Sequence, residues 1–307
     1  MIRLRATTVI LASAVLAVTL VTACSGTGGQ PSAATATPTA SPTPSCHPGV
    51  SGAENWIMGT GELSAARSAS PSSVRYAVNP AHLMVLLLRG QTSSYGHGVA
   101  DFRSYAEFKK MIRQGTIPAG IRWVMYDNER WSLTPANEQA NPVRYERLFA
   151  GLAHRHGYKV ILAPAQDLVP GWTKQSFQAG NAIWRGYLSM GLAAASARYG
   201  DIYEIQAQPY ETSTYRSQHA YASFVAAAAA QARAANPGAV IYAGLSTQRV
   251  SSAAQLLQDY LATRDLVDGY WMNIPRHNEP GPVAIADQFF RDLPASASAG
   301  AAACGGI

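Results

Sequence analysis

The pattern that most restricts the fold of this chain is a repeated alternation of short apolar runs with helical segments. Six runs of strand character start about 30 to 43 residues apart, and a segment of helical periodicity follows each one. The runs are Leu83–Leu88, Ile121–Tyr126, Lys159–Ala163, Ile202–Gln206, Ala239–Ala243 and Gly269–Ile274. The predicted helices are Asp101–Arg113, Pro142–His156, Asn181–Tyr199, Ser217–Ala235, Ser252–Thr263 and Val283–Phe290. Repeated βαβ units of this kind predict a parallel sheet.

A parallel sheet is either open and doubly wound or closed into a barrel, and the two place polar residues differently. An open sheet concentrates its site at one switch point, whereas every strand of a barrel ends at a shared mouth. Polar residues follow all six runs: Arg89 to Gln91, Asp127 to Glu129, Gln166 and Asp167, Gln206 with Gln208 and Glu211, Ser246 to Gln248, and Asn273. The sequence therefore predicts an α/β fold, a TIM-like (β/α) barrel with six clear βα units. The two missing strands are expected in the irregular region Cys46–Pro80, at Asn55 to Met58 and Ser73 to Val78.

The second run, Ile121–Tyr126, leads into the densest group of chemically useful side chains. Asp127 and Glu129 follow it, and residues i and i+2 of a strand share a face, so both carboxylates should point the same way. Glycoside cleavage needs one carboxylic acid and one carboxylate, so Glu129 is the predicted general acid and Asp127 its partner. The alternative is that both form surface ion pairs with Arg122 or Arg130, or cap a nearby helix.

A row of polar residues, Glu204, Gln206 and Gln208, alternates along the fourth run. Both faces of a parallel sheet are buried and usually apolar, so this row predicts a hydrogen-bonded barrel interior able to hold hydroxyl groups. The alternative is a polar network that only fixes the barrel. Gln206 and Gln208 are predicted to bind substrate, and Glu211 is a second candidate carboxylate opposite Glu129.

The aromatic composition favours rings with a polar group, because the chain has 15 Tyr and 6 Trp against 7 Phe. Sugars stack on such rings, although ordinary cores use them too. Trp131 and Trp271 lie near C-terminal strand ends and are predicted to bind substrate. Asp167, which follows the third run, and Asn273, near the end of the last run, complete the predicted substrate-binding residues.

The N-terminal residues predict export and a lipid anchor. Arg3 and Arg5 precede an uncharged apolar run that ends in small residues and Cys24, as in a lipoprotein signal peptide (residues 1–23) whose cysteine is acylated. The alternative is an ordinary secretory signal with an incidental cysteine. Residues 24–45 form a Ser/Thr/Pro/Ala-rich tether that cannot bury enough apolar surface to fold. The protein is thus expected outside the cytoplasm, lipid-anchored at the cell membrane or secreted.

The remaining cysteines, Cys46 and Cys304, lie at the two ends of a predicted single domain, residues 46–307. In an oxidising compartment they are expected to form a disulfide; two free thiols are the alternative. Neither has the spacing of a zinc ligand, and no metal or cofactor is expected. The formal charge of +6 falls to +4 without the signal peptide, and no basic cluster exceeds Lys109-Lys110. Nucleic acid is therefore not expected as a partner, and the protein is expected to be a monomer.

The stretches MYDNERW, IYEIQAQPYE and GYWMN carry a resemblance to glycoside-hydrolase-like (β/α) barrels of secreted actinobacterial lipoproteins, which are largely uncharacterised. The resemblance covers about Leu83 to Phe290. The D-x-E of the first stretch is also similar to the end of the acidic D-x-D-x-E strand motif of chitinase-like hydrolases. In that family the Glu is the general acid and the Asp orients it, which implies these roles for Glu129 and Asp127.

Three functional hypotheses follow from the sequence. The first is a membrane-anchored extracytoplasmic glycoside hydrolase that acts on a poly- or oligosaccharide. The second is a catalytically inactive carbohydrate- or cell-wall-binding lipoprotein on the same barrel. The third is a metal-dependent hydrolase that uses Asp127, Asp167 and His277.

Overall fold

The computed structural model describes residues 55–69, 71, 74, 80–87, 91–172, 182–212 and 219–304. They all belong to the second of two compact units, Cys46–Ile307, and none lies in the first, Met1–Ser45. The predicted signal peptide, the tether, Cys24 and Cys46 lie outside the described residues. Cys304 ends the last helix, but its side chain is not described, so the predicted disulfide lies outside them as well.

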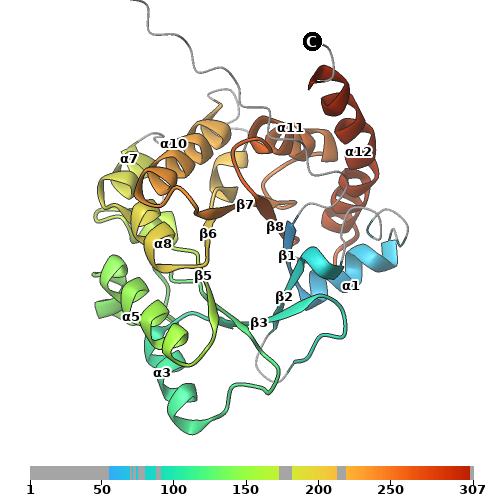
Figure 1. Cartoon of the computed structure of the whole chain (residues 1–307). Helices are drawn as coiled ribbons and strands as arrows, with labels where there is room; N and C mark the ends of the chain where they lie inside the picture. Colours follow the sequence, from blue (N-terminus) through green and yellow to red (C-terminus); the bar gives the residue numbers. More distant parts are fainter. Residues whose placement is uncertain are drawn as a thin grey trace, which may run out of the picture. The chain divides into compact units, whose positions relative to one another are not determined.

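Eight parallel strands form a closed barrel in chain order, which confirms the predicted TIM-like architecture (Figure 1). They are β1 Asn55–Gly59, β2 Leu83–Leu87, β3 His97–Phe102, β4 Trp123–Tyr126, β5 Lys159–Leu162, β6 Ile202–Ile205, β7 Val240–Ser246 and β8 Gly269–Asn273. Strand β1 closes the ring by pairing with β8, where Trp56 lies opposite Tyr270. Because all strands run the same way, their C-terminal ends meet at one mouth.

Alternate residues of the strands fill the barrel, as the two-residue period of a strand requires. The interior contains mostly apolar side chains, namely Ile57, Met84, Leu86, Val99, Met125, Ile161, Ala163, Ile202, Tyr242 and Trp271. The opposite faces pack against helices, as Tyr126 does on Phe149 with ring centroids 4.8 Å apart. These layers hold the strand ends in fixed positions.

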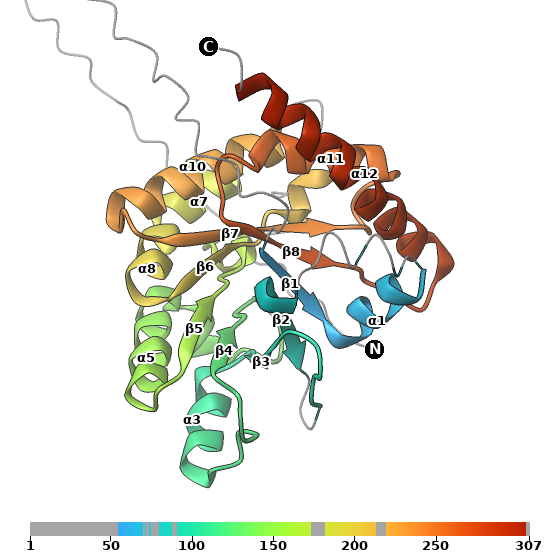
Figure 2. The same ribbon diagram turned by 45° about the vertical axis from the view of Figure 1, so that its right-hand side comes forward.

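The helices lie around the outside of the barrel. They are α1 Thr60–Ala69, α3 Tyr105–Gln114, α4 Ala136–Gln139, α5 Pro142–Arg155, α7 Ala182–Ser189, α8 Leu192–Tyr199, α10 Ala220–Ala235, α11 Ala253–Thr263 and α12 Pro280–Cys304. Short 3₁₀ turns occur at η1 Pro80–His82, η2 Gln166–Leu168 and η3 Gln208–Glu211. Figure 2 shows α12 alongside α11 and α1. No helix in the described part of the chain has the length and apolar character needed to cross a membrane.

The origin of the eighth strand differs from the prediction. The region Cys46–Pro80 supplies β1, but the other strand is β3, His97–Phe102, where a helix starting at Asp101 was predicted. A histidine, a glycine and an aspartate interrupt the apolar pattern of β3, so the run does not stand out in the sequence. The helix starts at Tyr105, after Ser104 has capped it by accepting from the Glu107 N–H. Of the predicted strand Ser73–Val78, only Val74 is described, and it is helical.

Glu146 is a fully buried carboxyl between the barrel helices, and it predicts a pH dependence of stability. Its Oε2 on α5 accepts from Ser196 Oγ on α8 at 3.0 Å. Burial raises its pKa from 4.5 to about 8, opposed by the Ser196 hydrogen bond. Between these pH values the unfolded chain ionises this group while the folded protein keeps the proton. The free energy of unfolding should therefore fall as pH rises from 4.5 to about 8.

Urea denaturation at about pH 5 and pH 8 tests this expectation. Glu146→Gln removes the titrating group and retains an amide that can bond Ser196. The variant should lose less stability than the parent between the two pH values. An equal loss in both proteins would show that Glu146 does not contribute to the pH dependence.

Candidate active site

The mouth of the barrel contains an acidic cluster, which we define as Asp101 of β3, Asp127 and Glu129 after β4, and Glu204 of β6. Asp101, Asp127 and Glu204 occupy interior-facing positions, because Val99, Met125 and Ile202 lie two residues before them and face the interior. The charges of Asp101, Glu129 and Glu204 all interact with that of Asp127. The predicted pair Asp127 and Glu129 is thus joined by two further acids.

Asp127 is held by two side chains from other strands. Its Oδ2 accepts from Arg103 Nε at 3.1 Å, and its Oδ1 accepts from Gln206 Nε2 at 2.7 Å. Burial raises the pKa of Asp127 to about 6, while Arg103 and the Gln206 hydrogen bond lower it. The aspartate is therefore mainly ionised at neutral pH. It does form an ion pair, but within the mouth and not with Arg122 or Arg130.

Glu129 is half-buried, and its carboxyl has no hydrogen bond or ion pair with any described residue. Burial, together with the negative charges of Asp127 and Asp167, raises its pKa to about 8. Glu129 therefore keeps its proton at neutral pH, while Asp127 beside it does not. This is the difference in protonation that acid/base catalysis by two carboxyls requires.

Arg103 links Asp127 to Asp101, and sequence analysis identified neither Arg103 nor Asp101 as a site residue. Arg103 Nη2 lies 2.8 Å from Asp101 Oδ2, and its guanidinium lies over the Trp131 ring, 5.5 Å from the centroid. Burial raises the pKa of Asp101 to about 8, and the charge of Asp127 adds to this. An acid and an arginine two positions apart after Val99 were the signal in the sequence, and they were read as the start of a helix.

Glu204 lies deeper in the barrel and is fully buried. Neither carboxyl oxygen has a hydrogen-bond partner among the described residues. Burial raises its pKa well above the ordinary value, and the charges of Asp127 and Glu129 contribute. Two residues later Gln206 donates to Asp127 and, at 2.8 Å, to the Ala163 carbonyl. Gln206 is thus placed beside the carboxylate pair by its hydrogen bonds.

The loop after β4 is fixed by hydrogen bonds that orient Trp131. Trp131 Nε1 donates to Thr134 Oγ1 at 2.8 Å, and Thr134 donates to the Arg103 carbonyl. Asp167 Oδ1 accepts from the Arg130 N–H at 2.9 Å, so this predicted substrate-binding residue also anchors the loop. Trp131 stays half-buried at the mouth.

The other predicted site residues lie near β6, β7 and β8. Strand β6 ends at Ile205, so Gln208 does not continue the alternating row; it lies in η3, packed so closely over Gly244 that a Cβ there would overlap its amide. Glu211 is buried, and its Oε2 accepts from the Ser246 N–H at 2.9 Å. Trp271 faces the barrel interior with its Nε1 unbonded to described residues, and Asn273 is half-buried at the end of β8.

The ligands proposed for the metal-dependent hydrolase are not brought together. Within the described residues, no group of three His, Cys, Asp or Glu side chains could hold a metal ion. His277 is exposed after β8, beside Gly61 and Glu62 of α1. Asp127 and Asp167 lie at the ends of β4 and β5. The structure therefore gives the third hypothesis no support from geometry.

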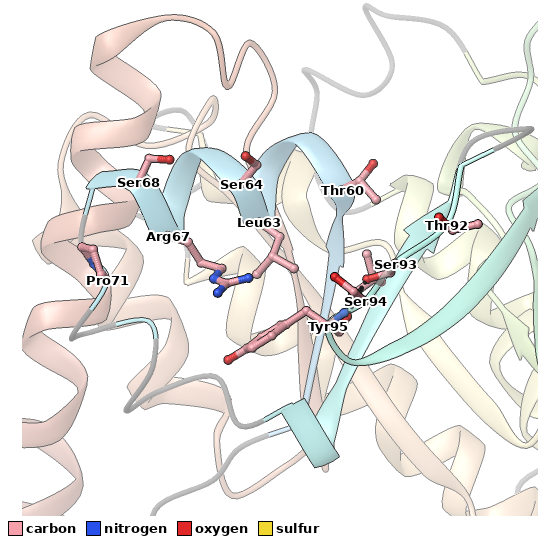
Figure 3. Close-up of a pocket in the computed structure, with 11 residues that line it drawn as sticks. Thr60, Leu63, Ser64, Arg67, Ser68, Pro71, Thr92, Ser93, Ser94 and Tyr95 are labelled. Carbon is pink, nitrogen blue, oxygen red and sulfur yellow. Dashed lines mark hydrogen bonds between the residues drawn. The ribbon is translucent and has the colours of Figure 1, made fainter.

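A hollow of about 1230 Å³ lies away from the acidic cluster, between α1 and the connection from β2 to β3 (Figure 3). The described residues of this connection, 91–96, contain no helix. Leu63 and Val85 give the hollow an apolar part, and Arg67 lies over the Tyr95 ring at 4.2 Å from its centroid. None of the cluster acids lines it, so it is separate from the candidate site.

Comparisons with known proteins found similarity in fold but none in sequence family. No protein-family model and no curated protein matches the sequence. Among solved structures, an archaeal fructose 1,6-bisphosphate aldolase is similar at a TM-score of 0.42 and 10% identity, over 78% of this chain and 93% of that one. A Schiff base forming fructose-1,6-bisphosphate aldolase is similar at a TM-score of 0.39 and 8% identity, over 78% of this chain and 93% of that one. Likenesses this distant are no guide to activity.

Proposed function

We propose that this barrel is a glycoside hydrolase that uses Glu129 as general acid and Asp127 as its ionised partner. One observation carries the proposal: two carboxyls lie two residues apart at a barrel mouth, and Asp127 accepts from Arg103 and Gln206 while the Glu129 carboxyl accepts from no described residue. These contacts favour the ionised form of Asp127, and burial beside that charge favours the protonated form of Glu129. Glycoside cleavage requires this combination, because the leaving oxygen needs a proton and the sugar becomes cationic.

The half-buried position of Glu129 fits proton donation to a glycosidic oxygen that enters the mouth. Asp127 lies lower, with each oxygen already accepting one hydrogen bond, so its part is to stabilise positive charge and to keep Glu129 protonated. In this proposal Gln206, Asn273 and Trp131 bind sugar hydroxyls and ring faces. Glu211 is a weaker second carboxylate than Asp127, because its Oε2 is bonded to the Ser246 N–H.

The place of action in this proposal follows from the N-terminal sequence. Export by the signal peptide and acylation of Cys24 would hold the barrel at the outer face of the membrane on the tether. There a Cys46–Cys304 disulfide could form, and polysaccharides would be within reach.

Release of reducing ends from bacterial cell-wall, plant and fungal polysaccharides tests the proposal, measured across a range of pH. Hydrolysis should decline below about pH 6, where Asp127 becomes protonated, and above about pH 8, where Glu129 loses its proton. An Asp127→Asn/Glu129→Gln double variant should be inactive on the same substrate. Binding of one polymer by both proteins without release from any would replace the hydrolase by the carbohydrate-binding lipoprotein.

A further inference from the structure

Several buried carboxyl oxygens of the acidic cluster have no hydrogen-bond partner among the described residues. Asp101 Oδ1 and both oxygens of Glu204 are buried and have no partner among the described residues. The nearby donors are already engaged: Gln206 Nε2 donates to Asp127 and to the Ala163 carbonyl, and Arg103 bonds Asp101 and Asp127. Buried acceptors usually have partners, so three orphaned oxygens around one carboxylate indicate a missing donor.

The described part of the mouth also has few cations near these acids. Arg103 is the cation that acts on Asp101, Asp127 and Glu129, and Arg130 acts on Asp167. No described cation is among the groups that act on Glu204. Carboxyls without a counter-ion are costly to bury, and a cationic ligand would offset this cost.

We infer that the mouth binds a sugar with a free, protonated amino group, as in a de-N-acetylated amino sugar. The inference rests on the proposed function for the sugar. An ammonium group has three donors and a positive charge, which complements the unpartnered carboxyl oxygens of Asp101 and Glu204 and favours their ionised forms. It binds above Asp101, Asp127 and Glu204, while Glu129 keeps its proton for the glycosidic oxygen.

The two other common substituents fit this cluster poorly. An N-acetyl group replaces the charge by a neutral amide and adds a carbonyl acceptor. The carboxylate of a uronic acid adds a negative charge beside the ionised Asp127, which repels it, and it brings no cation to the other acids. The expected order of affinity is therefore amino sugar, then N-acetylated sugar, then uronic acid.

Calorimetric titration of the full chain with tetramers of glucosamine, N-acetylglucosamine and galacturonic acid tests this order. The glucosamine tetramer should bind at least about tenfold more tightly than the other two. Asp101→Asn and Glu204→Gln keep the side-chain shape and should each weaken its binding about tenfold, without affecting the N-acetylated tetramer. Asp265→Asn removes a carboxylate that is 89% exposed, outside the cluster, and serves as the matched control.

The results separate this inference from the proposed function. Equal binding of the three tetramers, or equal effects of Asp265→Asn and Asp101→Asn, would overturn the amino-sugar inference. Glu129-dependent hydrolysis that is confined to a neutral glycan would also overturn the amino-sugar inference, but it would support the proposed hydrolase activity. Selective glucosamine binding that depends on Asp101, without hydrolysis of any glycan, would support the inferred ligand class and contradict the proposed hydrolase activity.

Discussion

Replacing Glu129 by glutamine is expected to lower kcat/KM for the natural glycan by about 10²- to 10⁴-fold, the usual contribution of a general acid. Glutamine has nearly the same shape but cannot donate an acidic proton to the leaving oxygen. Because the Glu129 carboxyl has no partner among the described residues, the change removes no structural contact. At neutral pH the variant should be at least as stable as the parent, because the folded protein holds a proton at Glu129 that the unfolded chain releases, and glutamine removes this cost. Reducing-end kinetics and urea denaturation measure the two effects.

The leaving group distinguishes proton donation from any other role of Glu129. An aryl glycoside with an acidic phenol leaves without protonation, so Glu129→Gln should slow its hydrolysis far less than that of the glycan. Glu107→Gln, on the exposed surface of α3, should change neither rate and is the matched control. Equal losses on both substrates would mean that Glu129 does not act as the acid.

The barrel was predictable because its signal repeats. Six strands of apolar residues, each followed by a helix, leave few alternatives to a parallel sheet, and polar residues after every strand favour closure. Strand β3 was missed because of its own composition: its exposed first residue His97, Gly98 and the mouth residue Asp101 break the apolar run. Asp101, which belongs to the acidic cluster, is thus also one of the residues that make β3 difficult to recognise in the sequence.

Part of the site was also predictable, because it is local. Asp127 and Glu129 are two positions apart on one strand end, which the sequence shows directly. Arg103 and Gln206 reach Asp127 from 24 and 79 positions away, and such contacts appear only when the barrel closes. The difference in pKa between the two acids depends on these contacts and on burial, so the sequence could supply the pair but not its protonation.

The sequence could not separate catalytic carboxylates from those that hold the backbone. Glu62 accepts from the N–H groups of Gly59 and Ile274 and so links the ends of β1 and β8. Glu211 of η3 accepts from the N–H group of Ser246 and so links η3 to the end of β7. These acids lie near strand ends, as Glu129 does, but backbone N–H groups bond both oxygens of Glu62 and Oε2 of Glu211. A free carboxyl at the mouth is therefore the better sign of chemistry.

Glu138 is the strongest case of a carboxylate that holds the backbone, and Glu138→Ala is expected to destabilise the protein by about 3 kcal/mol or more. Its buried carboxylate accepts from the N–H groups of Tyr105 and Ala106 and from the hydroxyl groups of Ser104 and Tyr126, at 2.7 to 3.3 Å. Alanine would leave these donors buried without a partner at the start of α3. Urea denaturation with a two-state fit measures the loss.

Two further variants separate this role of Glu138 from a general sensitivity of α4. Asn137→Ala changes the exposed neighbour on the same short helix and should cost less than about 1 kcal/mol. Glu138→Gln keeps one acceptor oxygen and should fall between the parent and the alanine variant, because the amide cannot accept all four bonds. If Glu138→Ala and Asn137→Ala were equally stable, the carboxylate would not hold α3 to the barrel. The connection from β3 to α3, which carries Arg103, would then need another support.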